Sequence, residues 1–186
     1  MPTYIALLRA VNVGGYGKLS TADFRKLLEG LGFENVQTYI QSGNAVFDAP
    51  GAATKVGTAI AAGVEKLMGA KVDVMVRTHE ELTRLIAANP FADEAAEDGA
   101  RVAVSFLAGE AAPAARPAFQ AIQEKYPQRR DRFHVAGEHI YFHFPDGAGE
   151  TKFTGKALER AIGVPGTARN WNTVLKLHEM SKRRNG

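Results

Sequence analysis

The chain has 186 residues, a hydrophobic content of 45% and a formal net charge of +3. A chain of this length and composition can bury a core, which excludes a protein that is disordered throughout. It contains no cysteine, so disulfides, thiolate metal ligands and a cysteine nucleophile are also excluded.

Two further features concern location and charge. No run approaches the roughly 20 apolar residues of a membrane helix, and Met1 to Tyr4 lacks the basic and then apolar pattern of a signal peptide. We therefore expect a cytoplasmic protein that does not use a membrane. Residues 1–90 carry 9 basic and 8 acidic side chains and residues 91–186 carry 14 and 12, so neither half is a basic module.

The chain begins with an apolar strand, Thr3 to Arg9, that runs into a glycine-rich loop from Ala10 to Lys18. Ser20 to Asp23 has the composition of a capping box, and it predicts a helix that Gly32 closes. This strand, loop and helix are the start of the first predicted unit.

A hairpin is expected next. Val36 to Gln41 and Asn44 to Phe47 are predicted strands, and Ser42-Gly43 between them is a two-residue turn signal. That turn places one set of side chains on an apolar face: Val36, Thr38, Ile40, Ala45 and Phe47. The other, mostly polar face carries Gln37, Tyr39, Gln41, Asn44 and Val46.

After Pro50-Gly51, apolar residues at helical spacing from Val56 to Leu67 predict a second helix that ends at Gly69. Val72 to Val76 predicts a fourth strand. The order strand, helix, strand, strand, helix, strand is that of a ferredoxin-like plait.

The second half starts with Thr78 to Glu81, another capping box, which predicts a short connecting helix that Asn89-Pro90 stops. The acidic residues from Asp93 to Asp98 are expected to form a solvated linker. A buried strand from Val102 to Leu107 and a helix with Pro117 in its first turn follow.

Asp131 to Phe144 carries the clearest hairpin signal in the chain, with Gly137-Glu138 as a two-residue type II′ turn. This register pairs Val135 with Ile140 on an apolar face. The opposite face carries Arg132, His134, His139, Tyr141 and His143.

A helix ending at Gly163 and a weak strand near Thr167 to Trp171 repeat the order of the first half, before a terminal helix. We therefore predict an α+β fold, a tandem duplication of ferredoxin-like (βαββαβ) plaits. Residues 1–90 are expected to form the first plait with the connecting helix, and residues 91–186 the acidic linker, the second plait and the C-terminal helix. The halves share this pattern without visible residue identity.

The glycine-rich loop is a candidate anion site, because backbone amides and a helix N-terminus favour negative charge and Lys18 lies close in sequence. It is not a Walker A loop, which would need glycine in place of Asn12 and serine or threonine in place of Leu19. The third glycine of a dinucleotide fingerprint is likewise replaced, by Ser20. Glycines that only form a tight turn are the alternative.

A plait places its first strand beside its third, so Arg9 is expected near Asn44. Tyr39, Gln41 and Asn12 extend this polar cluster. Such side chains bind a hydrogen-bonding ligand better than they transfer protons, since none titrates near neutral pH. The alternative is that this face packs against the second half of the chain and its polar groups satisfy one another.

The histidines of the second hairpin raise two other functions. On a strand, His139 and His143 lie about 13 Å apart at roughly 3.3 Å per residue, too far to share one ion, so we predict no metal site. A basic and aromatic sheet face is also how RNA-recognition plaits stack bases, although their Arg-Gly-aromatic signature is missing here. The candidate phosphate contacts for that function are Lys125, Arg129 and Arg130.

The segment from Arg169 to Thr173 joins residues that can cap the last helix to Trp171, which buries a large apolar area. Its structural role would be to fasten that helix to the sheet. No nucleophile elbow, serine triad spacing or two-carboxylate signature is present in the sequence, so we assign no catalytic residue and expect no cofactor.

Three ordered segments, Tyr4 to Gly15, Thr38 to Asn44 and Arg169 to Val174, resemble the bacterial domain-of-unknown-function family 1697. The chain departs from it at Ala10-Val11, where family members more often have Gly-Ile. The resemblance implies two ferredoxin-like plait subdomains and no particular activity. Its motif positions are our candidate site residues: Arg9, Asn12, Gly14, Gly15, Lys18, Tyr39, Gln41, Ser42, Gly43, Asn44, Arg169, Asn170, Trp171, Asn172 and Thr173.

We therefore expect a cytoplasmic binding module for a small polar or anionic ligand, either a monomer or a weak homodimer, whose motifs converge on one site. This hypothesis predicts Arg9, Asn44 and Arg169 in one pocket. The second hypothesis is binding of single-stranded nucleic acid through the face from His134 to His143. The third is an enzyme that acts on a phosphorylated metabolite, which has only the basic groups and the glycine loop in its favour.

Overall fold

The computed structural model describes residues 1–9, 18–41 and 43–182 of the chain. These residues divide into two compact units. Unit 1 is Met1–Ala87 together with the chain from Leu175, and unit 2 is Ala88–Val174. In the part of the chain that the structure describes, no helix is long and apolar enough to cross a membrane.

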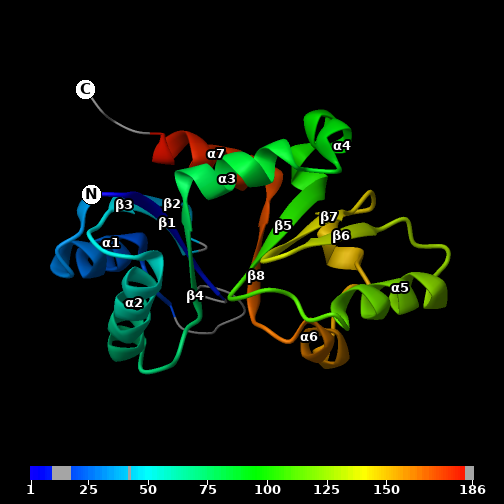
Figure 1. Ribbon diagram of the computed structural model, residues 1–186, viewed down its shortest axis with the longest axis horizontal. Coiled ribbons are helices and arrows are strands. Elements are labelled where there is room, and N and C mark those ends of the chain that lie inside the picture. Colours follow the sequence, from blue (N-terminus) through cyan, green and yellow to red (C-terminus); the bar gives the residue numbers. More distant parts are fainter. Residues whose placement is uncertain (10–17, 42, 183–186) are drawn as a thin grey trace. The chain divides into compact units, whose positions relative to one another are not determined.

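Unit 1 has the predicted order of a plait. Its elements are β1 (Thr3–Leu8), α1 (Thr21–Gly30), β2 (Glu34–Tyr39), β3 (Asn44–Asp48), α2 (Ala53–Met68), β4 (Val74–Thr78) and α3 (His79–Ala87). The strands pair antiparallel in the order β2-β3-β1-β4, and α1 and α2 cover one face of this sheet (Figure 1). The core on that face joins Tyr4, Ala6 and Leu8 of β1 to Phe24 of α1 and Ile60 of α2.

Unit 2 repeats the arrangement. Its elements are α4 (Ala92–Glu97), the 3₁₀ turn η1 (Gly99–Arg101), β5 (Val102–Leu107), α5 (Ala115–Lys125), β6 (Arg132–Ala136), β7 (His139–His143), the 3₁₀ turn η2 (Ala148–Glu150), α6 (Lys156–Ile162) and β8 (Gly166–Asn170). The sheet order is β6-β7-β5-β8, with α5 and α6 on one face (Figure 1). The prediction of an α+β fold with duplicated ferredoxin-like plaits is confirmed. The last helix, α7 (Trp171–Ser181), starts in unit 2 and continues in unit 1.

Local signals in the sequence predicted several element boundaries correctly. Ser20 caps α1 by accepting a hydrogen bond from the Asp23 amide at 3.0 Å. Thr78 and Glu81 cap α3 reciprocally, because each side chain accepts a hydrogen bond from the backbone amide of the other. The second hairpin has the predicted register, which pairs Val135 with Ile140.

The first hairpin differs from the prediction. Tyr39 pairs with Asn44, so four residues connect β2 to β3. The prediction of a two-residue turn at Ser42-Gly43 is therefore wrong. The register of β2 on β3 differs from the predicted one by two residues. Because side chains alternate with a period of two, each residue within the strands keeps its predicted face. Ile40 is the exception: it lies outside the strand with a φ of 47° and is 49% exposed, so its predicted place on the apolar face is wrong.

The acidic segment after α3 contains a short helix, α4, where a loop was predicted, while its side chains Asp93, Glu97 and Asp98 are exposed, as expected for a solvated segment. Glu94 of α4 accepts a hydrogen bond from Arg132 of β6 at 2.5 Å, and this bond lowers the pKa of the Glu94 carboxyl. The Arg132 guanidinium also lies 4.9 Å from the centre of the Phe91 ring. These contacts with a distant strand hold the segment in place.

Both units have an arginine at the same position of their last strand, an equivalence that the two halves of the sequence did not show. Arg77 pairs with Ile5 of the central strand in unit 1, and Arg169 pairs with Val104 of the central strand in unit 2. Each arginine is buried and donates a hydrogen bond to the carbonyl of the residue before it. Each also precedes the residue that caps the following helix, Thr78 in unit 1 and Asn170 in unit 2.

We expect replacement of Asn170 by alanine to reduce the free energy of unfolding by about 1 kcal/mol, because α7 loses the side-chain oxygen that accepts from the Thr173 amide at 3.0 Å. Urea denaturation measures the change. Asn170→Asp is the matched control, since aspartate caps equally well. An aspartate variant as unstable as the alanine variant would show that capping is not what Asn170 contributes.

Helices α3 and α7 lie side by side (Figure 1), joined by two stacked histidines whose ring centres are 4.3 Å apart, His79 and His178. His79 Nδ1 lies 2.8 Å from the Ser181 hydroxyl, and His178 Nε2 lies 2.8 Å from the Thr83 hydroxyl. Burial lowers the pKa of His178, and the neighbouring charges of His79 and Lys182 lower it further. The neutral imidazole is therefore the form that the fold favours.

This packing predicts a loss of stability in mild acid. Because the unfolded chain has a histidine pKa near 6.5 and the folded pKa of His178 is lower, the unfolded chain binds more protons between the two values. The free energy of unfolding is expected to fall as the pH drops from about 7 to about 5. Urea denaturation across this range measures the slope, and His178→Gln should reduce it; an unchanged slope in the variant would refute the assignment.

Candidate functional site

Three strands of unit 1 bring predicted site residues to one end of the sheet. Leu7 near the end of β1 pairs with Asn44 at the start of β3, and Asn44 pairs on its other side with Tyr39 at the end of β2. Arg9 directly follows β1 and Gln41 follows β2. We call this group, Arg9, Tyr39, Gln41 and Asn44, the first-sheet end.

Asn44 orders the backbone of this end. Its side chain is buried, with 1% of its surface exposed, and its amide nitrogen donates a hydrogen bond to the Tyr39 carbonyl at 3.0 Å. The Leu8 amide donates to the Gly43 carbonyl at 2.9 Å, which fixes the next position of the same connection. The polar side chain of Asn44 therefore has a structural role in the hairpin connection.

Arg9 is held by its backbone, and its side chain is partly exposed. Its amide donates to the Asp73 carbonyl at 3.0 Å, and its guanidinium lies 3.6 Å from the Asp73 carboxylate. The two side chains are 36% and 52% exposed. An exposed pair of this kind is worth about 0.2 to 1 kcal/mol, so separating these two groups costs little.

Unit 2 shows that the fold does not require a cation at this place. The Leu107 amide donates to the Glu138 carbonyl at 2.9 Å, as Leu8 does to Gly43. The next amide, from Ala108, donates to the Pro165 carbonyl at 2.9 Å, as Arg9 does to Asp73. Ala108 therefore occupies in unit 2 the backbone position of Arg9, without a charged side chain.

The remaining site residues of the first half are partly described. Lys18 is exposed and lies two residues before Ser20, the residue that caps α1. Because α1 packs on the sheet and turns directly into β2, its first turn lies toward the end where β2 finishes. Four predicted positions fall outside the described residues: Asn12, Gly14, Gly15 and Ser42.

The closing motif is used inside unit 2. The buried Arg169 donates a hydrogen bond to the Thr167 hydroxyl at 2.6 Å, and burial lowers the pKa of its guanidinium to about 10. Asn170 caps α7 and Trp171 is buried. Asn172 packs so closely on Gly99 that a Cβ there would collide with its side-chain oxygen. A pocket shared by Arg169, Arg9 and Asn44 stays a prediction.

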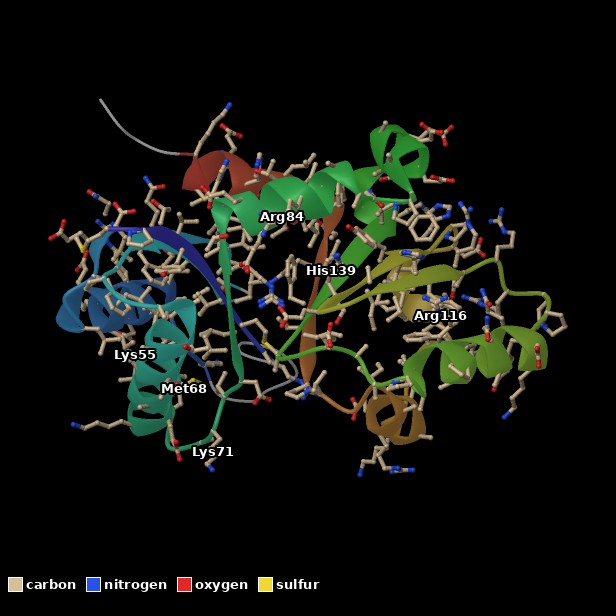
Figure 2. The ribbon with its side chains drawn as sticks, in the orientation of Figure 1. Lys55, Met68, Lys71, Arg84, Arg116 and His139 are labelled. Carbon is tan, nitrogen blue, oxygen red and sulfur yellow. The ribbon has the colours of Figure 1, made fainter. Side chains whose placement is uncertain are left out.

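The histidine-bearing face of the second hairpin has the predicted composition. Tyr141 at its centre is fully buried, which raises the pKa of its hydroxyl to about 12. The His139 ring meets the Tyr141 ring edge-on with centres 5.0 Å apart, and Figure 2 shows this histidine on β7. Over residues 1–9, 18–41 and 43–182, no three His, Cys, Asp or Glu side chains are grouped to hold a metal ion.

The cations proposed to contact phosphate in unit 2 are engaged with neighbouring groups. Arg130 donates to the Asp146 carboxylate at 2.7 Å, and Arg129 donates to the Glu150 carbonyl at 2.5 Å. The Lys125 ammonium lies 5.5 Å from the centre of the Tyr126 ring.

Two residues beside the first-sheet end, Asp73 and Ile40, were not selected from the sequence. Asp73, which pairs with Arg9, follows Val72 in a segment that was predicted as strand. Ile40 was placed on the apolar face because the turn was taken as two residues. A four-residue connection, which Gly43 also permits, would have identified Ile40 as a loop residue.

Comparison with known proteins agrees with this architecture. Over 97% of this chain and 99% of the other, the structure is similar to the conserved bacterial protein SP0830 from Streptococcus pneumoniae, with a TM-score of 0.69 and 20% identity. This likeness shows the fold alone.

Two other solved structures match weakly. An unknown protein from Galdieria sulphuraria has 12% identity, covers 91% of this chain and 98% of its own, and gives a TM-score of 0.26. A putative chlorite dismutase, TA0507, has 11% identity, and the match covers 99% of this chain and 89% of the other with a TM-score of 0.21. Neither supports an argument about function, and no curated protein matches the chain.

The family model described as "Protein of unknown function (DUF1697)" matches residues 1–141, which include unit 1 up to Ala87 and end before the closing motif at Arg169. That span is most of the chain, and the resemblance of the opening and middle motifs pointed to the same family. The protein belongs to the DUF1697 family.

Proposed function

We propose that the protein is a binding module for a small anionic ligand and that Arg9 at the first-sheet end holds the anionic group. The observation that carries the proposal is the position of Arg9: its side chain is partly exposed at a place where unit 2 has Ala108. Unit 2 forms the same backbone hydrogen bonds without a charge at this position, which makes the Arg9 charge the candidate for a role in ligand binding.

The neighbours of Arg9 support binding by hydrogen bonds. Asn44 fixes the connection between β2 and β3, and the exposed Gln41 lies in that connection with an amide that can donate and accept. Lys18 adds a second exposed cation toward the same end. The result is positive charge beside neutral polar groups, an arrangement that suits a phosphate or carboxylate.

The same residues favour binding over catalysis. Proton transfer needs a group that titrates near the working pH, whereas arginine stays protonated and amides do not titrate. The hypothesis of an enzyme for a phosphorylated metabolite gains no residue from the described part of this end.

Nucleic-acid binding through unit 2 has less support. Stacking of a base requires an accessible ring, and the central Tyr141 is fully buried. The Arg129 and Arg130 side chains are already bonded to a carbonyl and a carboxylate.

We expect at least one of phosphate, pyrophosphate, AMP and succinate to raise the Tm of the protein, because a ligand that binds only the folded state stabilises it. Arg9→Ala is expected to weaken that binding about 10- to 100-fold, the effect of losing one charge-assisted hydrogen bond. Thermal-shift titration measures both effects. Arg84→Ala, which removes an exposed arginine from α3 (Figure 2), is the control and should bind as the original protein does.

The proposal is wrong if none of the four anions stabilises the protein, or if Arg9→Ala binds as tightly as the original. Without ligand, Arg9→Ala should shift the Tm by no more than about 2 °C, since an exposed ion pair contributes little.

A second variant is expected to change the affinity for the anion in the opposite direction. The Asp73 carboxylate competes with an anionic ligand for Arg9, so Asp73→Asn should tighten binding of the same anion about 2- to 5-fold. Isothermal titration at low ionic strength measures the gain. Weaker binding in this variant would mean that Asp73 orients Arg9 for the ligand and does not compete with it.

A further inference from the structure

The connection between β2 and β3 contains a backbone conformation that its residue disfavours. Among the residues that the structure describes, two that are not glycine have positive φ: Asn35 at 52° and Ile40 at 47°. Asparagine adopts this left-handed region readily, but a β-branched side chain there is a genuine outlier. Ile40 is therefore strained.

Burial does not compensate for the strain. The Ile40 side chain is 49% exposed and is not among the residues that form the core of unit 1. Elsewhere the chain meets the same backbone requirement with glycine, at Gly43 in the same connection and at Gly137 in the second hairpin. Glycine at position 40 would remove the strain and lose only the contacts of a half-covered side chain, which leaves the isoleucine side chain with a role to explain outside the fold.

Ile40 lies at the first-sheet end. It directly follows Tyr39, whose partner Asn44 pairs with Leu7, two residues before Arg9. Neighbouring strands are about 4.8 Å apart, so two strand spacings place the Tyr39 and Leu7 backbones about 10 Å apart, and Ile40 and Arg9 follow these strands at the same end. An apolar side chain and a guanidinium at this end of the sheet can contact the two ends of one small molecule.

We infer that Ile40 supplies an apolar contact to the ligand, and that the ligand is an anion with an aromatic or other apolar portion, such as an aryl phosphate or an aryl carboxylate. This inference rests on the proposed function, because Arg9 holds the anionic group. The strain in the connection is the cost of presenting the isoleucine side chain to the ligand.

Two pairs of probes test the inference by isothermal titration: phenyl phosphate against methyl phosphate, and benzoate against acetate. The original protein should bind the aryl member of at least one pair about 5- to 10-fold more tightly, since an apolar contact of one ring face excludes water from both partners. The pair that shows the preference identifies the anionic group as phosphate or carboxylate.

Ile40→Gly should abolish the aryl preference and leave affinity for the smaller anion within about twofold, and its Tm without ligand should rise by about 2 °C as strain is released. Asn35→Gly is the matched control, because it changes the other left-handed residue of the same strand region and should keep the preference.

Three results separate the possible failures. An original protein that binds the small anion without an aryl preference, or an Ile40→Gly variant that keeps the preference, overturns the inference and leaves the proposed function standing. A fall in Tm in Ile40→Gly also overturns it, because the side chain would then serve the fold. Failure of all four probes to bind the original protein overturns the inference, and the proposed function falls with it only if phosphate, pyrophosphate, AMP and succinate also fail to stabilise the protein.

Discussion

The pairing of β1 with a neighbour on each side is the constraint on which unit 1 depends. Its alternate residues Tyr4, Ala6 and Leu8 enter the core under the helices, while Ile5 and Leu7 on the other face are also fully buried. A central strand buried on two faces cannot shift its register without exposing one set of side chains. That register is what places Leu7 beside Asn44 and leaves Arg9 at the strand exit, where its amide is bonded to Asp73.

Comparison of the two plaits separates residues that both copies of the fold use from residues that only one copy has. A buried arginine followed by a helix cap recurs as Arg77-Thr78 and Arg169-Asn170, so this pair is part of how each plait joins its last strand to a helix. The charge of Arg9 does not recur, since Ala108 has its place. The same backbone hydrogen bonds form with either side chain. Among the sequence motifs, the first-sheet end is therefore the one whose charge the fold does not explain.

Sequence reasoning was accurate where the determining interactions are local. The Ser20 and Thr78 caps and the Gly137 turn depend on residues a few positions apart, and each was predicted correctly. It was wrong where the determining contact is distant or the conformation is unusual. Helix α4 makes its side-chain contact with Arg132, 38 positions after Glu94, and no propensity places an isoleucine at positive φ. The equivalence of Arg77 and Arg169 became visible only through strand register.

Two arginines from the predicted site differ in a way that bears on ligand exchange. Arg169 is buried, its guanidinium is bonded to the Thr167 hydroxyl and to its own backbone, and burial lowers its pKa to about 10. Moving such a group toward a ligand would break several bonds inside a low-dielectric environment. Arg9 is more exposed than Arg169, and its guanidinium lies 3.6 Å from the half-exposed Asp73 carboxylate. Separating that one exposed pair costs about 0.2 to 1 kcal/mol, so under the proposed function an anion would replace the Asp73 carboxylate beside Arg9 at lower cost than it would draw Arg169 out of its bonds.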